Sequence, residues 1–170
     1  AVLCVGLIGL ASNSAYAGLQ ATIGSQGTGN GQFDQPWGLG VNSTGWIYVV
    51  EYYNQRISLF DNSTNHSFSS HLIDPEITYN NCSSRGGGSD CSTNGRFNGP
   101  HEIEFDSSDN FWVLDLSNHR LQKFSQDGTY LSQFGSYCDV EANTSGCNAS
   151  ASGALATGDG QFYSPKDFAI

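Results

Sequence analysis

Apolar and polar residues alternate in short runs through the middle of this chain. The runs at 39–41, 47–49 and 57–59 carry apolar side chains at every second position. A period of two residues is typical of a half-buried β-strand and differs from the spacing of a helix. Turn-forming residues at 42–45 and 61–64 separate these runs. The pattern predicts strands joined by tight turns, and no helix is evident anywhere in the chain.

These strands belong to a unit that the chain repeats. The segment Gly31-Gln-Phe-Asp-Gln-Pro36 returns as Gly95-Arg-Phe-Asn-Gly-Pro100 and opens again as Gly160-Gln-Phe-Tyr-Ser-Pro165. A fourth strand closes each of the first two copies, at 67–73 and at 130–135. We therefore expect an all-β fold in which each unit is a four-stranded antiparallel meander, with its strands a, b, c and d in chain order.

The repeat divides the chain into units at 31–94 and 95–159, with the start of a third at 160–170. In an antiparallel meander the turn from strand b to strand c and the connection from strand d to the next unit lie at the same end. The stretches that follow strand d, at 74–94 and 136–159, are therefore expected beside the b–c turns.

Two further alignments concern the ends of the repeat region. Residues 19–24 align with the outer strand at 130–135, and residues 168–170 align with the innermost strand at 103–105. We expect a strand at both places. About two and a half units are fewer than repeat folds usually need, so we expect part of a longer array.

The motif after the second strand carries a resemblance to a known family. Behind each Gly-x-Phe-x-x-Pro segment comes an acidic residue, then Asn and Arg, as Glu51-x-x-Asn54-x-Arg56 and Asp115-x-x-Asn118-His119-Arg120. This order resembles the NHL repeat, over residues 31–60 and 95–135 and in part over 160–170. The resemblance implies blades of a β-propeller, here a partial one. The acidic residue and Arg are expected to form an ion pair, either across the turn or between blades, that serves the fold.

The second unit is also similar to peptidyl-hydroxyglycine amidating lyases. His101 stands where the first unit has Trp37, and in that family Pro-His strand starts place histidines on a central zinc. Of the four histidines only His101 falls on such a position. The resemblance implies that His101 is a zinc ligand; the alternative is a histidine that caps a strand through a hydrogen bond.

The balance of charge argues against two classes of binding partner. The chain has 16 acidic and 6 basic residues and a net charge of −10, so nucleic acid and anionic membranes are not expected as partners. No resident cofactor is expected, with zinc and calcium as the alternatives. For calcium, the acidic residues of the two insertions either bind the ion or are solvated surface charge: Asp74, Glu76, Asp90, Asp139 and Glu141.

The start of the chain predicts export. Residues 1–10 are almost entirely apolar and lead to Ala15-Tyr-Ala17, a pattern typical of a signal-peptidase site. We therefore interpret residues 1–17 as a secretory signal and residues 18–170 as the propeller region; a buried strand or a short membrane anchor are the alternatives. In an exported chain, four cysteines in two equally spaced pairs predict two disulfides. They are Cys82, Cys91, Cys138 and Cys147, and they pair either within each insertion or between the two.

Acceptor motifs for N-glycosylation are dense in this chain. The six Asn-x-Ser/Thr acceptors fall in predicted turns or insertions, where a glycan can be accommodated: Asn42, Asn62, Asn65, Asn81, Asn143 and Asn148. The alternative is that Asn, Ser and Thr simply favour turns.

These observations predict a secreted, disulfide-bonded, N-glycosylated propeller that acts as a non-catalytic binding or assembly module. Its partners would be proteins or further copies of the chain that meet at open blade edges, as in an extracellular fibre. The alternative function is a zinc-dependent amidating-lyase-like enzyme in which His101 is one ligand.

Overall fold

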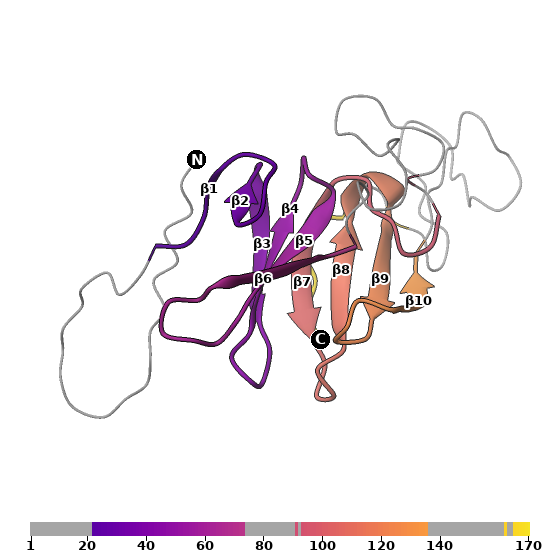
Figure 1. The fold of residues 1–170 in the computed structure, drawn as a ribbon. Coiled ribbons are helices and arrows are strands. Elements are labelled where there is room, and N and C mark those ends of the chain that lie inside the picture. The colour runs from indigo at the N-terminus through magenta and orange to yellow at the C-terminus, as the bar shows by residue number, and fades with distance from the viewer. Residues whose placement is uncertain (1–21, 74–90, 92, 136–161, 163–164) are drawn as a thin grey trace, which may run out of the picture.

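The computed structural model describes residues 22–73, 91, 93–135, 162 and 165–170. Two four-stranded antiparallel sheets dominate these residues (Figure 1). Blade 1 contains β3 (Pro36–Val41), β4 (Ile47–Glu51), β5 (Arg56–Phe60) and β6 (Phe68–Leu72). Blade 2 contains β7 (Pro100–Phe105), β8 (Phe111–Asp115), β9 (Arg120–Phe124) and β10 (Tyr130–Phe134). In each blade the strands lie in chain order, which confirms the predicted all-β fold and the meander in both units.

The turns between strands a and b have the predicted backbone. Gly45 and Asp109 occupy equivalent positions in the two blades, and both have positive φ, 84° and 58°. A side-chain oxygen closes each turn, because Asn42 Oδ1 accepts a bond of 2.9 Å from Trp46 N and Asp106 Oδ1 accepts one of 3.0 Å from Asn110 N. Residues without a β-branch suit these positions, where a left-handed backbone is needed.

The turns between strands b and c are also equivalent in the two blades. Gln55 and His119 have positive φ values of 56° and 54°. In blade 2 the turn includes η2 (Leu116–Asn118), one turn of 3₁₀ helix, an element that the alternating pattern did not predict. Such short helices form where a chain reverses tightly.

The described parts of the two strands expected at the ends of the repeat region, residues 22–24 and 168–170, lie in no strand. Ile23 and Gly24 precede a two-residue strand, β1 (Ser25–Gln26), which pairs in parallel with β2 (Gln32–Phe33). Residues 25–33 thus fold back on themselves, and Gly27 N donates to Phe33 O at 2.9 Å. The alignment of residues 19–24 with 130–135 still matches equivalent positions at its last residue. Gly24 lies against the Phe33 ring, and Gly135 lies in the same way against the Phe162 ring.

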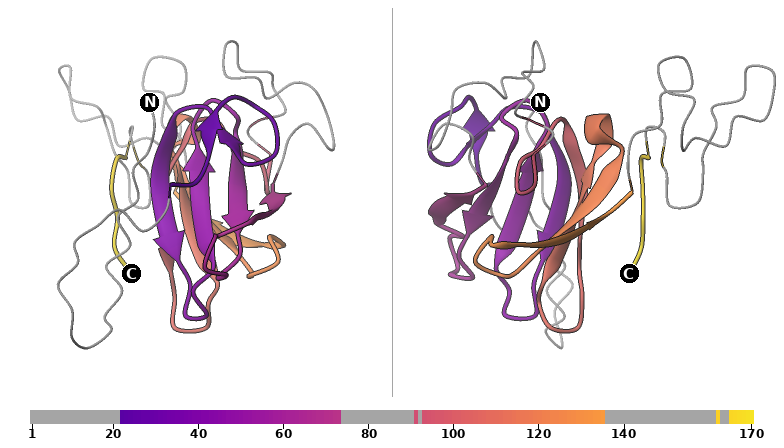
Figure 2. Two further views of the ribbon diagram at one scale, coloured as in Figure 1. Left: turned by 60° about the vertical axis from the view of Figure 1, so that its left-hand side comes forward. Right: turned by 90° about the vertical axis from the view of Figure 1, so that its right-hand side faces the viewer.

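The two blades pack face to face, as the side views show (Figure 2). One cluster of buried side chains fills the space between them: Tyr48, Val50 and Ile57 from blade 1 with Phe97, Ile103, Phe111, Val113 and Phe124 from blade 2. A second cluster covers the other face of blade 1: Phe33, Ile47, Val49 and Phe60. Strand β4 is buried along its whole length, since its alternate side chains enter different clusters.

The phenylalanine of each Gly-x-Phe segment anchors the loop before strand a. The Phe33 ring packs on Phe60 and the Phe97 ring packs on Phe124, with centroids 5.6 Å apart in both blades. Phe60 and Phe124 end strand c of their blades. The repeated Phe therefore belongs to the core.

The innermost strands β3 and β7 approach each other closely at a glycine. A Cβ added at Gly38 would lie 2.6 Å from the carbonyl oxygen of His101 and 3.1 Å from Glu102 Cα. Because both are backbone atoms that cannot turn away, this seam between the blades requires a residue without a side chain at position 38.

Candidate functional site

The acidic residue and the arginine of each repeat form a buried ion pair within their own blade. Arg56 Nε lies 3.0 Å from Glu51 Oε1, and Arg120 Nε lies 2.8 Å from Asp115 Oδ2. Within each pair the residues are direct partners across the ladder of strands b and c. Of the two arrangements expected from sequence, the pair across the turn is therefore the one formed.

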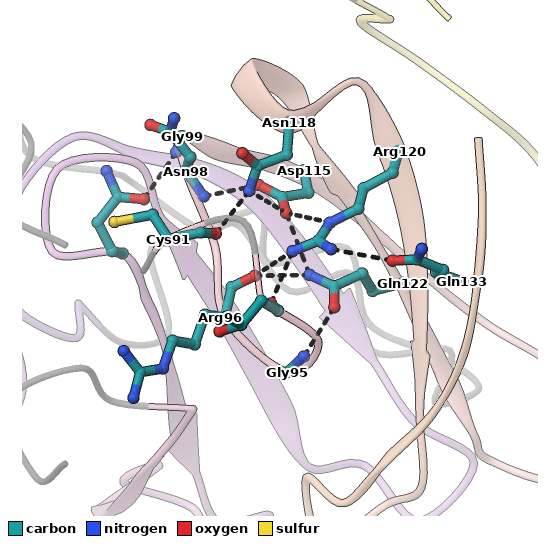
Figure 3. A network of polar contacts seen from close by, with 12 residues as sticks. Cys91, Gly95, Arg96, Asn98, Gly99, Asp115, Asn118, Arg120, Gln122 and Gln133 are labelled. Carbon is teal, nitrogen blue, oxygen red and sulfur yellow. Dashed lines mark hydrogen bonds and ion pairs between the residues drawn. The ribbon is translucent and has the colours of Figure 1, made fainter. Parts of the chain in front are cut away.

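The same motif holds the loop that precedes strand a. In blade 2, Asn118 Nδ2 donates to Cys91 O at 2.7 Å, and Arg120 Nη2 donates at 2.9 Å to both Thr93 O and Arg96 O (Figure 3). The equivalent atoms of blade 1 donate at 3.2 Å to the carbonyls of Gly27, Gly29 and Gln32. We call this arrangement the loop clamp. It confirms that the b–c turn and the connection between units share one end of the blade.

Asp115 is the centre of the clamp in blade 2. Besides the arginine, its carboxylate accepts hydrogen bonds from Asn98 N at 2.6 Å, Asn118 Nδ2 at 2.8 Å and Gln122 Nε2 at 3.1 Å. Burial raises the pKa of Asp115 to about 6, against the lowering effect of Arg120 and of these donors. The arrangement keeps a buried charge satisfied, and it leaves the carboxylate directed at the protein's own backbone.

The two clamps differ at positions that the sequence analysis did not single out. In blade 2, Arg120 Nη1 donates to Gln133 Oε1 at 2.9 Å, and Gln122 ties Arg96 O to the carboxylate. In blade 1, Ser58 and His71 stand at these positions; Ser58 Oγ bonds the Glu51 carboxylate and lies 3.0 Å from His71 Nδ1. The repeat alignment contained this signal at Ser58 and Gln122, which break the match between the units, whereas His71 and Gln133 correspond only through the strand ladders.

His101 lies where the innermost strand of blade 2 departs from regular pairing. The ladder between β7 and β8 shifts register between Pro100 and Ile103, and that between β3 and β4 shifts between Pro36 and Gly38. Such bulges redirect side chains, often beside functional sites. The Nδ1 atom of His101 is buried and has no hydrogen-bond partner among the described residues. Burial lowers its pKa, and Lys166 adds to this effect.

The described residues do not complete a zinc site around His101. No group of three or more His, Cys, Asp or Glu side chains suited to a metal occurs among them, and zinc in proteins takes at least three protein ligands. The acidic residues considered for calcium all lie outside the described residues. Zinc and calcium binding both stay predictions.

A group of three aromatic rings lies on one side of His101. The Trp37 ring meets the His101 ring edge to face at 4.4 Å and stacks on Tyr52 at 5.2 Å, and Tyr52 contacts Tyr53. Trp37 is 51% exposed. Although the sequence showed Trp37 as the counterpart of His101, only the fold brings in the two tyrosines from the b–c turn.

The glycosylation acceptors differ in access. Asn62 and Asn65 are exposed, as acceptors must be. Asn42 is 5% exposed and its Nδ2 is buried, because its Oδ1 closes the a–b turn. The glycan at Asn42 stays a prediction, and the burial of Nδ2 in the folded chain weighs against it. Asn81, Asn143 and Asn148 lie outside the described residues.

Of the predicted disulfide cysteines only Cys91 is among the described residues, and it is disulfide-bonded. Its backbone carbonyl is held by Asn118, so the cysteine lies beside the b–c turn, as the topology predicts. Cys82, Cys138 and Cys147 lie outside the described residues, so the pairing stays a prediction. The predicted signal at residues 1–17 lies outside them as well.

The part of the chain that the structure describes contains no helix long and apolar enough to cross a bilayer.

Among solved structures the chain is similar to selenomethionine-substituted virginiamycin B lyase from Staphylococcus aureus. The TM-score is 0.39 with 9% identity, over 63% of this chain and 28% of the lyase chain. No curated protein matches the sequence.

A family model provides the sequence match. The model of the NHL repeat matches residues 33–60 and 97–124. Each matched segment runs from the phenylalanine that anchors the loop to the phenylalanine that ends strand c, and so contains the whole ion pair of its blade. The chain therefore contains two NHL repeats, and its two described sheets are four-stranded blades of the β-propeller type.

Proposed function

We propose that this chain is part of a secreted, disulfide-bonded, N-glycosylated propeller that acts as an assembly module through its blade edges. The acidic and arginine residues that the repeats share are engaged in the loop clamps, which supports a structural role for the most prominent polar motif. Some large apolar and aromatic side chains are instead exposed on the described surface, among them Trp37, Leu131 and Phe134.

The outer edge of blade 2 carries this proposal. Strand β10 is an edge strand of its sheet, and Leu131 and Phe134 on it are 48% and 53% exposed. An edge strand with large apolar side chains favours pairing with another chain, which natural proteins usually prevent with charged residues. Strand β10 itself has none. A second copy of this chain would pair with its backbone and cover both side chains.

Sedimentation velocity over a concentration series, with negative-stain electron microscopy, tests the proposal on the purified chain. We expect concentration-dependent association in the wild type and its loss in Leu131→Lys combined with Phe134→Lys. Ser132→Lys, exposed on the same strand, is the control for added charge. A wild-type protein that stays a monodisperse monomer at high concentration would contradict assembly. The modifications are tested on protein from a secreting host. The loss of mass on glycosidase treatment tests the glycans, and the change of mass on reduction tests the disulfides.

The alternative function, a zinc-dependent lyase, is favoured by one observation. The buried Nδ1 of His101 lacks a partner among the described residues, and an imidazole nitrogen of this kind suits a metal. Metal analysis of purified protein separates the two functions. Stoichiometric zinc that is lost in His101→Ala would favour the lyase, and zinc-free protein would remove it.

A further inference from the structure

Three aromatic side chains form a group at the end of blade 1 that carries the b–c turn. Trp37 lies at the start of the innermost strand, and Tyr52 and Tyr53 follow strand β4 in the b–c turn. The Trp37 ring stacks on the Tyr52 ring with centroids 5.2 Å apart, and the Tyr52 ring meets that of Tyr53 edge to face at 5.3 Å. We call these three residues the aromatic platform.

The repeat indicates that a blade does not need this platform in order to form. At the equivalent positions blade 2 has His101, Leu116 and Ser117. Blade 2 nevertheless forms the same four strands, the same positive φ in its b–c turn and the same buried ion pair. The phenylalanines of the core, by contrast, are buried in both blades. An aromatic group that only one unit has therefore points to binding and not to folding.

Trp37 is exposed and yet held in place. Its side chain is 51% exposed, although its ring stacks on Tyr52 and meets the His101 ring edge to face at 4.4 Å. The Tyr52 ring is itself fixed against the backbone of blade 2, because a Cβ added at Gly99 would lie 2.7 Å from Tyr52 Cε2. The platform thus presents a flat aromatic surface to solvent in one orientation, and such preorganisation lowers the entropic cost of binding.

The charges near the platform disfavour an anionic ligand. Burial, and after it the charge of Lys166, lower the pKa of His101, so its imidazole is neutral at pH 7. The pKa of the next residue, Glu102, is raised by burial and further by the carboxylates of Asp167 and Glu104, and the whole chain has a net charge of −10. A neutral ligand with hydroxyl groups avoids this repulsion and suits a neutral imidazole, which both donates and accepts hydrogen bonds.

We propose that the aromatic platform binds a neutral carbohydrate, one of whose pyranose rings stacks on the exposed indole of Trp37. A β-linked glucose unit has all its substituents equatorial, so both faces of the ring present C–H groups and the hydroxyls lie around the rim. The negative face of the indole attracts these C–H groups. The proposal goes beyond assembly through β10, and it needs no metal at His101.

Cellohexaose, a neutral oligomer of β-linked glucose, is the probe. Its binding is measured by NMR titration of the isotope-labelled full chain, with EDTA in the buffer so that no metal contributes. The chain has three tryptophans, and we expect the indole signal of Trp37 to shift while those of Trp46 and Trp112 stay in place. An oligogalacturonate of the same length tests an anionic sugar, and decaproline tests a peptide. Binding of either that equals or exceeds that of cellohexaose, or an unshifted Trp37 signal, would overturn the proposal.

Variants locate the site. Trp37→Ala is expected to weaken cellohexaose binding about 10-fold or more, as the loss of a hot-spot tryptophan does, and Trp37→Phe is expected to retain part of the affinity. Val41→Ala is the matched control, since Val41 is 44% exposed on the same strand, and it should bind as the wild type does. Circular dichroism checks that each variant is folded. Equal affinity of Trp37→Ala and Val41→Ala would overturn the proposal; if Trp37→Ala does not fold, Trp37→Phe and the wild-type indole signals decide.

Discussion

Replacing Arg120 by lysine tests whether the loop clamp depends on the guanidinium or only on its charge. Arg120 spreads its bonds over three nitrogens: Nε to Asp115 Oδ2 at 2.8 Å, Nη2 to two backbone carbonyls at 2.9 Å, and Nη1 to Gln133 Oε1 at 2.9 Å. A lysine keeps the positive charge but offers all its donors from one atom. One ammonium beside Asp115 cannot also reach both the loop and β10.

The expected cost follows from the bonds that lysine cannot make. Retention of the charge avoids the larger penalty of about 3–5 kcal/mol for leaving a buried carboxylate without its partner. Beyond the carboxylate, Arg120 makes three bonds, to Thr93 O, Arg96 O and Gln133 Oε1. A lysine that keeps one of them loses two, which at about 1.5 kcal/mol for each charge-assisted hydrogen bond gives about 3 kcal/mol. That is a large share of the roughly 5–15 kcal/mol that stabilises a typical domain. The same change at Arg56, whose hydrogen bonds to Glu51 and to the carbonyls of Gly29 and Gln32 are 3.0 to 3.2 Å long, is expected to cost less.

Urea denaturation followed by circular dichroism at pH 7.5 measures the change, at a pH where the Asp115 carboxylate is ionised in spite of its raised pKa. Hydrogen exchange provides a local readout, because amides of the clamped loop at 93–98 should lose protection first. Ser132→Ala, on the exposed edge strand, is the matched control. If Arg120→Lys lowers the free energy of unfolding by no more than this control does, the positive charge alone holds the loop. The argument that the loop needs the separate nitrogens of the guanidinium is then refuted.

Three further predictions concern the seam, the turns and the glycans. Gly38→Ala should lower the melting temperature, because its methyl group would lie 2.6 Å from a backbone oxygen of β7, whereas at Gly29 the new atom meets only a flexible side chain; equal melting of the two variants would contradict this. The pKa of Asp106 is held below its ordinary value, first by Lys123, so its stabilisation is present above about pH 4 and is lost as the pH falls. Asp106→Asn should therefore flatten the decline of stability in acid, and an unchanged slope would argue against this. In a secreting host, Asn62→Gln should remove one glycan by mass and Asn42→Gln should remove none.

The local pattern was sufficient to predict the blades. Two local features specify each meander: the alternation along strands such as residues 47–49, and the turn residues that recur between strands. Near neighbours in the sequence set both the direction of a side chain in a strand and the backbone conformation of a tight turn. The repeated acidic residue and arginine also predicted a structural ion pair. Even the end of the blade at which the connection lies followed from strand order alone.

Contacts between residues distant in sequence decided the rest. The alternation could not say which carbonyls Arg120 binds, since these belong to a loop 24 and 27 positions earlier. Nor could an acceptor motif show that Asn42 is buried while Asn62 is exposed. A groove lined by Trp46 and Leu59 of blade 1 and by Gln126 of blade 2 exists only because the c–d turn of blade 2 lies beside blade 1. Burial and cavities arise from the packing of one blade on the next, which a repeat pattern within each blade does not contain.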